Sequence, residues 1–443
     1  MFETLPRGGA DALPERGLRA GLIEARERTL ELVDHVRDED LDRVHDPLMS
    51  PLAWDLGHIA AFEDLWVSRA TGRPALRPEL LEVYDAEETP RAERGDLPYL
   101  RHTEAREYLA EVGDGALEAL ADADLEDPAD PLNHRGLVWE LVLRHEHQHN
   151  ETMMQTLQIA APGVFRPDRP ALNGGGTDGQ RAQGPDMVHV EGGTFPMGAG
   201  SEGFAYDNER PRHEVEIQPF EIDRTLVTGA AFLAWVRDGG YERREWWTEA
   251  GWAWRCSEGI QRPRYWNPRG LVRAFDREEE PLRPELPVMH LSWHEADAYA
   301  RAHGKRLPTE AEWEMVASWD PQTGEKRRYP WGHDEPTPER ATLDQLPLGP
   351  AAVDACPEGA SPLGVLGLIG DAWEWTASEL QPYPGFRAHP YPEYSQAQFG
   401  KGYRVVRGGS WATRGRTIDA MFRSWDLPER RQIFVGFRCA ADG

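Results

Sequence analysis

The sequence predicts two domains of different fold class, an all-α bundle followed by an α+β domain. At 443 residues the chain is longer than one ordinary domain and suits two. Residues 1–165 contain long segments in which apolar residues recur with helical periodicity. Residues 166–186 include three consecutive glycines and no periodicity, which indicates a linker. Residues 187–443 place short extended pieces between many Gly and Pro residues, which is typical of an irregular α+β domain.

Four segments of the first domain are predicted to be helices. They cover residues 18–36, 51–71, 104–120 and 135–159. Ser50 and Pro51 mark the start of the second helix, because Ser is a favoured N-cap and Pro suits the first helical position. Four helices joined by polar connections favour an antiparallel four-helix bundle.

The second domain is expected to contain helices over Ser292–His303 and Thr309–Ala317. Thr309 is followed three residues later by Glu312, and this spacing predicts a capping box. The many Gly pairs and Trp residues elsewhere in the domain are explained by structure, since glycines permit tight turns and tryptophans supply large buried surfaces.

Composition argues against several classes of function. A net charge of -28 would repel a polyphosphate partner, which argues against nucleic-acid binding. The sequence contains no run of 18 apolar residues, so no membrane span is expected. The start of the chain shows no secretory hydrophobic region. Three widely spaced cysteines (Cys256, Cys356 and Cys439) indicate neither a disulfide framework nor a CxxC metal site. We therefore expect a cytoplasmic protein, as a monomer or a small homo-oligomer.

The fourth predicted helix contains the segment RHEHQHNE, with histidines at alternate positions. Residues four apart share a helical face, so His145 and His149 line up, whereas His147 points to the other side. The H-x3-H spacing resembles the paired ligands of zinc proteases, with Glu146 at the position of their catalytic base. Because no third protease ligand follows, hydrolysis is disfavoured. We expect His147 to be a solvated side chain, or one that lies behind the ligands without binding the metal itself.

A third ligand has to come from another helix. His58 lies in the apolar stretch LAWDLGHIAAF, where a core-facing imidazole needs partners for its ring nitrogens. Alone it would be read as a hydrogen-bonded core histidine, but a helical His pair in the same bundle makes it a candidate ligand. Imidazoles suit Zn, Cu, Fe or Ni, so the ligands alone do not choose the metal. His134, which precedes the fourth helix, is expected to have no metal role.

The second domain carries a set of sequence motifs. They are GGTFPMG (192–198), ERPRHEVEIQPFEIDRTLVT (209–228), PVMHLSWHEADAYARAHGKRLPTEAEWE (287–314), YPWG (329–332), GLIGDAWEWT (367–376), VVRGGSW (405–411) and VGFRCA (435–440). In content and in order this set resembles the formylglycine-generating-enzyme fold, a variant of the C-type-lectin architecture. Joined to a bundle with the H-x3-H-x-E pattern, this fold resembles the non-haem iron sulfoxide synthases of ergothioneine biosynthesis (hercynine oxygenases), whose bundle is of the DinB-like type.

That resemblance implies a metal site and a reaction. The family's three Fe(II) ligands fall on His58, His145 and His149, and a glutamine that helps to hold the histidine-derived substrate falls on Gln148. The implied activity uses O₂ to form a C–S bond at imidazole C2 of hercynine, with γ-glutamylcysteine or cysteine as the thiol. The sulfur is oxidised to a sulfoxide. Iron can pass electrons to O₂, which zinc cannot.

The resemblance also implies substrate-binding residues. In the segment FRSWDLPERRQIFVGFR, Trp425 would flank the betaine, whose trimethylammonium group is attracted by aromatic faces. Asp426 and Arg430 would hold the amino-acid end of the thiol substrate. Arg94 would bind a carboxylate of that substrate, since a guanidinium fixes a carboxylate through two parallel hydrogen bonds. Together these residues favour γ-glutamylcysteine as the donor.

Two features of the family pattern stay open. An active-site tyrosine supplies a proton in the family, and the candidates here are Tyr383 and Tyr391. The residue before the Trp-Asp pair is usually Asn in the best-known branch and is Ser424 here, which puts the details of substrate binding in doubt. A related branch that forms a C–Se bond from a selenium donor is therefore an alternative.

Other functions fit the sequence less well. A copper formylglycine-generating oxidase uses a cysteine pair near the C-terminal end, where only Cys439 is present. A lectin-like binding module would leave the histidines unexplained. An ovothiol-type enzyme usually carries a methyltransferase domain, for which the chain has no room. The expected partners are thus small molecules (hercynine, a thiol or selenol donor, and O₂), with no nucleic acid and no membrane.

Overall fold

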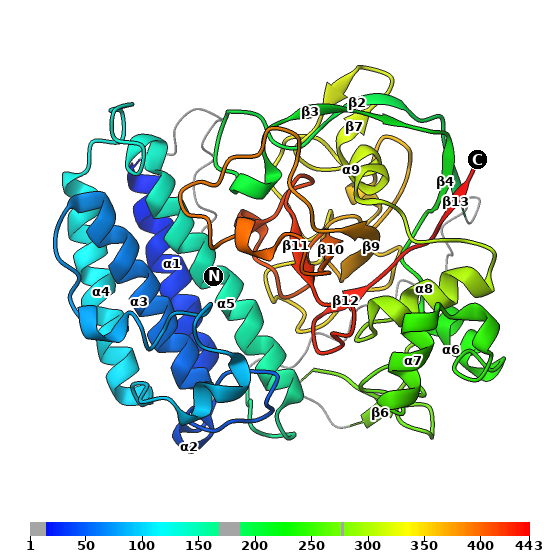
Figure 1. The fold of residues 1–443 in the computed structure, drawn as a ribbon, viewed down its shortest axis with the longest axis horizontal. Coiled ribbons are helices and arrows are strands. Elements are labelled where there is room, and N and C mark those ends of the chain that lie inside the picture. Colours follow the sequence, from blue (N-terminus) through cyan, green and yellow to red (C-terminus); the bar gives the residue numbers. More distant parts are fainter. Residues whose placement is uncertain (1–14, 168–186, 276–278) are drawn as a thin grey trace. The chain divides into compact units, whose positions relative to one another are not determined.

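A computed structural model describes residues 15–167, 187–275 and 279–443 (Figure 1). The chain divides into two compact units. Unit 1 contains the described residues up to 167 together with Ser201–Phe204, and unit 2 contains the other described residues. Nearly all of the predicted linker, residues 168–186, lies outside the described residues. Unit 1 is helical and unit 2 mixes helices with short strands, as the sequence predicts.

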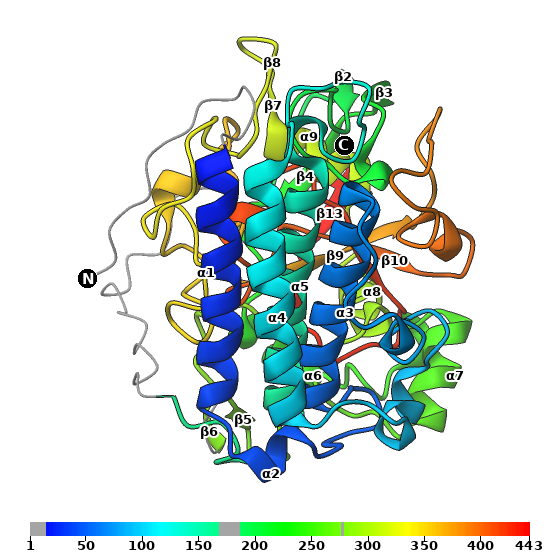
Figure 2. The ribbon, with the colours of Figure 1, turned by 90° about the vertical axis from the view of Figure 1, so that its left-hand side faces the viewer.

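Unit 1 is built on four long helices. They are α1 (Glu15–Asp34), α3 (Leu52–Thr71), α4 (His102–Asp122) and α5 (Leu137–Ile159), with a short α2 at Asp38–Leu41. Helix α3 packs against α4 and α5, and α1 packs against the same two helices (Figure 2). Their facing sides supply large apolar side chains to one core, including Leu18, Trp54, Leu56, Tyr108 and Trp139. All four predicted helices are therefore confirmed, with ends shifted by a few residues.

The predicted start of α3 is wrong in detail. Helix α3 begins at Leu52, Pro51 is the residue that flanks it, and Ser50 makes no capping bond. The Ser50 hydroxyl instead accepts a hydrogen bond of 2.9 Å from Nη1 of Arg94, so a buried guanidinium takes the oxygen that the helix end could have used. At the other end Gly72 stops the helix in the left-handed conformation that glycine favours, with φ of 68°.

The described residues of unit 2 form two main sheets and three two-stranded ribbons. One sheet has the order β1 (Met187–Val190), β4 (Phe220–Asp223), β13 (Ala440–Asp442), and the other has β11 (Ser424–Asp426), β10 (Arg404–Arg407), β9 (Trp373–Glu379), β12 (Val435–Gly436). The ribbons pair β2 (Gly193–Met197) with β3 (His213–Ile217), β5 (Leu271–Arg273) with β6 (Glu279–Pro281), and β7 (Trp319–Asp320) with β8 (Glu325–Lys326). The four helices of the unit are α6 (Gly229–Arg237), α7 (Glu249–Ser257), α8 (Trp293–Ala302) and α9 (Glu310–Ser318) in the described ranges.

The predicted capping box is present at the start of α9. The Thr309 hydroxyl accepts from the backbone N–H of Glu312 at 3.2 Å, and the Glu312 carboxylate accepts from the backbone N–H of Thr309 at 2.7 Å. Ser292 and Glu295 make the same reciprocal pair at the start of α8. Each box satisfies backbone donors that a helix end leaves without partners.

Strand β11 fixes the segment that contains the Trp-Asp pair. It runs antiparallel to β10, with Val405 opposite Trp425 and Arg404 opposite Asp426. Because neighbouring residues of a strand point to opposite faces of the sheet, this register sends Trp425 and Asp426 to different sides.

A buried ionic cluster joins α9 to the sheet of unit 2. Glu310 accepts from Arg407 at 2.8 Å and from Arg423 at 2.6 Å, and Glu314 accepts from Arg407 and Lys326, each at 2.7 Å. All five side chains are at most slightly exposed. Charges so far from water require such partners, so the cluster makes the position of α9 specific.

Asp371 is a buried carboxyl at a left-handed backbone position, with φ of 56°. Its Oδ1 accepts a hydrogen bond of 2.8 Å from the backbone N–H of Ala351. Burial raises the pKa of the Asp371 carboxyl to about 7, although hydrogen bonds from Ala351 and Thr342 act in the opposite direction. The folded protein therefore holds this proton at pH values at which the unfolded chain has released it.

Replacing Asp371 by asparagine is expected to remove a pH dependence from the protein's stability. Between the ordinary pKa of 3.8 and about 7 the folded state binds more protons, so the wild-type free energy of unfolding falls as the pH rises. This group contributes at most about 1.4 kcal/mol per pH unit. Asparagine tolerates the left-handed backbone and keeps an acceptor oxygen. Denaturant unfolding at pH 5, 6 and 7 should show Asp371→Asn gaining on the wild type as the pH rises, and a constant difference would contradict this.

Candidate metal centre

Two helices of unit 1 bring the three candidate histidines together. Helix α3 supplies His58, and α5 supplies His145 and His149 from one face. One ligand nitrogen from each residue lies within 4.8 Å of the others. The Nε2 atoms of His58 and His145 are 3.1 Å apart. Among the described residues this is the group of His, Cys, Asp or Glu side chains arranged to hold a metal ion.

The hydrogen bond of His58 shows which of its nitrogens faces the cluster. Nδ1 lies 2.7 Å from the carbonyl oxygen of Tyr84, and a carbonyl can only accept, so Nδ1 carries the proton. The Nε2 lone pair is then directed at His145. Tyr84 can approach because Gly57 has no side chain, and a Cβ there would lie 2.1 Å from the Tyr84 hydroxyl. Nitrogen lone pairs that converge in this way fit a cation.

The environment keeps the imidazoles of His58 and His145 in the form that binds metals. Burial lowers the pKa of His58 and of His145 well below the ordinary value, and the neighbouring His149 lowers both further. Neutral imidazole is the metal-binding form, so these two donors need no proton release near neutral pH.

Aromatic rings hold two of the imidazoles in place. Trp54 stacks on His58 with 5.0 Å between ring centroids and 11° between planes. Phe62 stacks on His145 at 3.6 Å and 10°. These contacts restrict rotation of both rings and so preorganise the donor nitrogens.

The other residues of RHEHQHNE have different roles. His147 is only 3% exposed and its Nε2 lies 3.4 Å from a carboxylate oxygen of Glu24, on the α1 side of α5. It lies outside the cluster, but the expectation of a solvated side chain is wrong, because α5 is covered by helices on both sides. Glu146 pairs with Arg26 at 3.0 Å and accepts from the Thr29 hydroxyl at 2.6 Å, so it is not available as a catalytic base.

Arg94 is buried next to Trp54 and is not a surface side chain. Its guanidinium sits 3.9 Å from the ring centre of Trp54, the residue that stacks on His58. It donates to Thr89 O, Ser50 Oγ and Ala86 O, which are all neutral oxygens. Burial, with the nearby Arg91, lowers the pKa of Arg94 to about 10.

Gln148 lies beside His149 on α5 and is half-buried.

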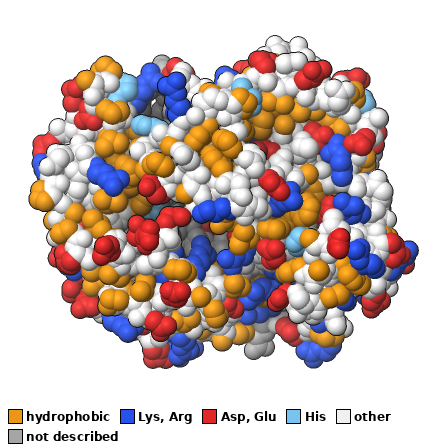
Figure 3. Space-filling view, viewed as in Figure 1, with side chains coloured by type: hydrophobic (Ala, Val, Ile, Leu, Met, Phe, Trp, Pro, Cys, Tyr) orange, Lys and Arg blue, Asp and Glu red, His pale blue; other side chains and the backbone are white. Residues whose placement is uncertain are grey.

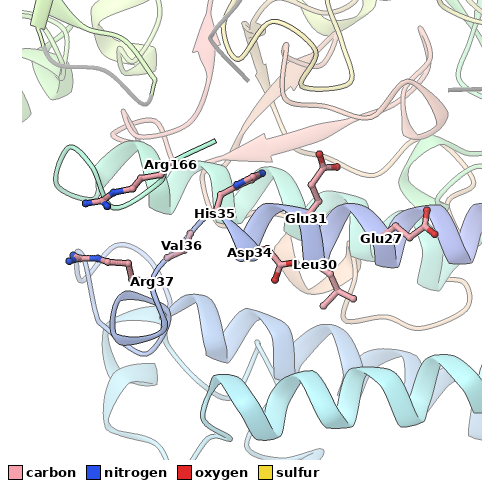
Figure 4. Close-up of a pocket in the computed structure, with 8 residues that line it drawn as sticks. All are labelled: Glu27, Leu30, Glu31, Asp34, His35, Val36, Arg37 and Arg166. Carbon is pink, nitrogen blue, oxygen red and sulfur yellow. The ribbon is translucent and has the colours of Figure 1, made fainter. Parts of the chain in front are cut away.

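A separate surface pocket of unit 1 contains no predicted site residue. It has a volume of about 760 Å³ and is lined by Glu27, Leu30, Glu31, Asp34, His35, Val36, Arg37 and Arg166 (Figure 4). The candidate centre is therefore not the pocket at the end of α1.

The predicted substrate-binding residues of unit 2 are grouped on β11 and the turn after it. Ser424, Trp425 and Asp426 form the strand and are half-buried. Nε of Arg430 lies 3.5 Å from Oδ1 of Asp426, and the same oxygen accepts from the backbone N–H of Leu427 at 2.8 Å. A cation and an anion thus lie side by side at this end of β11.

The two candidate tyrosines have different surroundings. Tyr383 is buried, its hydroxyl lies 3.4 Å from Glu310, and the guanidinium of Arg423 sits 4.1 Å from its ring centre. Burial raises the pKa of Tyr383 well above its ordinary value. Its contacts are those of the buried ionic cluster, which indicates a structural role.

Tyr391 belongs instead to an aromatic group that reaches Trp425. Its ring lies 6.1 Å from that of Tyr394, which meets Trp425 edge to face at 5.8 Å. Tyr206 stacks on Tyr394 at 4.4 Å and 14°. The sequence analysis missed Tyr394 and Tyr206. The Tyr-x-x-Tyr spacing was a signal for Tyr394, but nothing in the sequence connects Tyr206 with this segment.

Asp207 anchors the loop that carries Tyr391 and Tyr394. It is buried, and one carboxylate oxygen accepts from the backbone N–H of His389 at 3.3 Å. The other accepts from the Ser395 hydroxyl. Both ends of residues 389–395 are therefore tied to one side chain.

Comparisons with known proteins place this architecture. The DinB superfamily matches residues 22–153, and the Sulfatase-modifying factor enzyme 1-like domain matches residues 176–443. A hercynine oxygenase of Mycolicibacterium thermoresistibile is 46% identical over 448 residues, which covers 97% of this chain and 96% of that protein. The chain belongs to the hercynine oxygenase family. A hercynine oxygenase of Mycobacterium tuberculosis is 44% identical over 434 residues, with 97% and 99% covered.

Membership of the hercynine oxygenase family confirms the predicted fold class and the enzyme class. The protein is a metal-dependent oxygenase with a DinB-like bundle and a domain similar to formylglycine-generating enzymes. The formylglycine-generating enzyme of Thermomonospora curvata is 34% identical over 302 residues and 93% covered, but it matches only 58% of this chain. That partial match counts against the copper oxidase alternative.

Within the described residues, no helix of this hercynine oxygenase family member has both the length and the apolar composition that crossing a membrane requires. Acidic and basic side chains are interspersed over the face shown in Figure 3.

Proposed function

We propose that the enzyme is an Fe(II)- and O₂-dependent sulfoxide synthase that joins imidazole C2 of hercynine to the sulfur of γ-glutamylcysteine or cysteine. The observation that carries the proposal is the convergence of three imidazoles from α3 and α5, at least two of them held neutral by burial. It is supported by relatives named hercynine oxygenase that match nearly the whole chain. This reaction would be a step of ergothioneine biosynthesis.

Nε2 atoms of His58, His145 and His149 would hold the metal. Three protein donors would leave other coordination positions of the metal open to substrates. Bound iron would supply the capacity to pass electrons to O₂, which zinc lacks. The protein's part is to fix the donor geometry and to position the substrates, which replaces an improbable multi-body encounter.

The overall reaction balances with O₂ as the oxidant. Joining the two substrates breaks the imidazole C2–H and the thiol S–H bonds and releases two electrons. Oxidation of the sulfur to the sulfoxide releases two more. One oxygen atom of O₂ stays on sulfur, and the other leaves as water with the two protons.

Side chains of each unit match chemical groups of the proposed substrates. Trp425 offers an aromatic face to the trimethylammonium group, which has no hydrogen-bond donor. Asp426 suits the ammonium group of an amino acid, and Arg430 suits its carboxylate. The two side chains lie close together, with 3.5 Å between Nε of Arg430 and Oδ1 of Asp426. In unit 1, Gln148 would bind hercynine and Arg94 a second carboxylate, which favours γ-glutamylcysteine over cysteine.

Tyr391 is the proposed proton donor, because it shares an aromatic group with Trp425, whereas Tyr383 is bound into an ionic cluster. Tyr391→Phe is expected to lower turnover by about 10²- to 10⁴-fold with iron content unchanged, as loss of a general acid does. Tyr383→Phe is the matched control and should keep turnover within a few-fold of the wild type. Stopped-flow turnover and metal analysis distinguish the two, and the reverse pattern would transfer the role to Tyr383.

The donor atom is the open part of the proposal. Ser424 offers a hydroxyl where an amide side chain is usual, and it directly precedes Trp425. A selenium donor forming a C–Se bond is therefore the alternative. Iron-loaded enzyme should be mixed anaerobically with hercynine and γ-glutamylcysteine, cysteine or a selenium donor, exposed to O₂, and assayed by mass spectrometry. The γ-glutamylcysteine adduct is the expected main product, and no coupled product with any donor would refute the proposal.

A further inference from the structure

Asp55 is a carboxylate in the first turn of α3, three residues before His58 and completely buried at 0% exposure. Its Oδ1 lies 3.6 Å from Nδ1 of His149, across the gap between α3 and α5. We infer that Asp55 is a positioning residue that orients His149 and strengthens metal binding through it. This inference rests on the proposed metal site and names a residue outside its ligand set.

Asp55 differs from other buried carboxylates of the same helix. In the described part of the chain, neither of its oxygens has a hydrogen-bond partner. Asp64, nine residues further along α3, accepts from the backbone N–H groups of Leu76 and Arg77 at 2.9 and 3.1 Å and from the Tyr108 hydroxyl at 2.8 Å. The hydrogen bonds of the fold therefore account for the buried carboxylate of Asp64, but they do not account for that of Asp55.

A buried carboxylate without hydrogen bonds lowers the stability of the fold unless a positive charge compensates it. The N-terminal end of α3 offers partial positive charge. Arg94 lies close enough for the Asp55 charge to influence its pKa, but its own hydrogen bonds go to Thr89, Ser50 and Ala86. A cation bound to Nε2 of His149 would supply the missing charge through the imidazole.

The contact also selects the ring nitrogen that faces the cluster. At 3.6 Å the contact is longer than a hydrogen bond, but a carboxylate attracts a protonated Nδ1 and repels its lone pair, which favours the tautomer of His149 that keeps the lone pair on Nε2. The Tyr84 carbonyl does the same for His58 at 2.7 Å. A carboxylate does more than a carbonyl, because its charge makes the imidazole a stronger donor to the metal. The two outer acceptors thus orient two ligands from opposite helices.

The inference predicts that a change at Asp55 weakens metal binding without lowering the thermal stability of the metal-free protein. Asp55→Asn removes the charge but keeps the size, so we expect binding of Co(II) or Fe(II) alone to weaken about 10- to 100-fold. The same change removes an uncompensated buried charge, so the metal-free variant should be at least as thermally stable as the metal-free wild type. A residue that only supports the fold would show the opposite pattern.

The experiment measures metal dissociation constants anaerobically by competition with a chelator, for the full-length wild type, Asp55→Asn, Asp55→Ala and Asp64→Asn. The Co(II) visible spectrum reports the donor geometry. Asp64→Asn is the matched control, expected to lower the melting temperature but to bind metal with unchanged affinity. Metal affinity of Asp55→Asn equal to that of the wild type overturns the inference. A wild type that binds no metal refutes the proposed function itself.

Discussion

His58→Ala, His145→Ala and His149→Ala are each expected to lose iron and turnover, whereas His147→Ala keeps both. The three residues place donor nitrogens within 4.8 Å of one another, and His147 faces Glu24 on the far side of α5. Removing one of the three nitrogen donors leaves a pair, which holds a metal ion with open coordination positions much less firmly. Iron per chain after anaerobic reconstitution and desalting is the measurement.

The His147→Ala variant makes this test specific, because it removes the same side chain from the same helix. It should lose some stability with the Glu24 contact, so circular dichroism has to show that all four variants are folded. Iron loss on changing His147, or retention after any of the other changes, would overturn the assignment of ligands by helical face.

Glu310→Ala is expected to lower the free energy of unfolding by about 3–5 kcal/mol, the cost of breaking a buried ion pair from one side. Glu310 is the shared acceptor of Arg407 and Arg423, whose guanidinium groups are almost completely buried. Its loss leaves Arg423 without a carboxylate partner in the cluster and weakens the hold of α9 on the sheet. Denaturant unfolding of the full chain measures the change.

Glu335→Ala is the control for this prediction. Glu335 pairs with Arg328 at 2.7 Å, but its side chain is 63% exposed, so its loss should cost less than about 1 kcal/mol. Equal effects of the two substitutions would show that the buried cluster contributes no more than a surface pair.

Helices were predictable from the sequence because their signals are local. Apolar periodicity located α1, α3, α4 and α5, and the Thr309 capping box was read from residues three apart. The predicted start of α3 was wrong in detail, and the cause is a contact that no local sequence pattern contains. The Ser50 hydroxyl is bound by Arg94, 44 residues later in the chain.

The candidate site shows the same division. The i, i+4 spacing separated His145 and His149 from His147. His58 became a candidate ligand from its place in an apolar helix of the same bundle, and the family resemblance implied the same residue. Contacts between distant segments could not be read in this way. Asp207 binds Ser395 across 188 positions, and Asp55 reaches His149 only because α3 and α5 pack together. Whether Tyr383 or Tyr391 lies near Trp425 likewise depends on tertiary packing, since both tyrosines follow similar Pro-rich patterns.

The most direct test of the proposed activity is a single turnover of iron-loaded enzyme with hercynine, γ-glutamylcysteine and ¹⁸O₂, analysed by mass spectrometry. The account predicts one coupled product that carries a single ¹⁸O atom on sulfur, formed by the wild type and absent from His58→Ala. Oxidised thiol without any C–S product, or coupled product from His58→Ala at the wild-type rate, would contradict it.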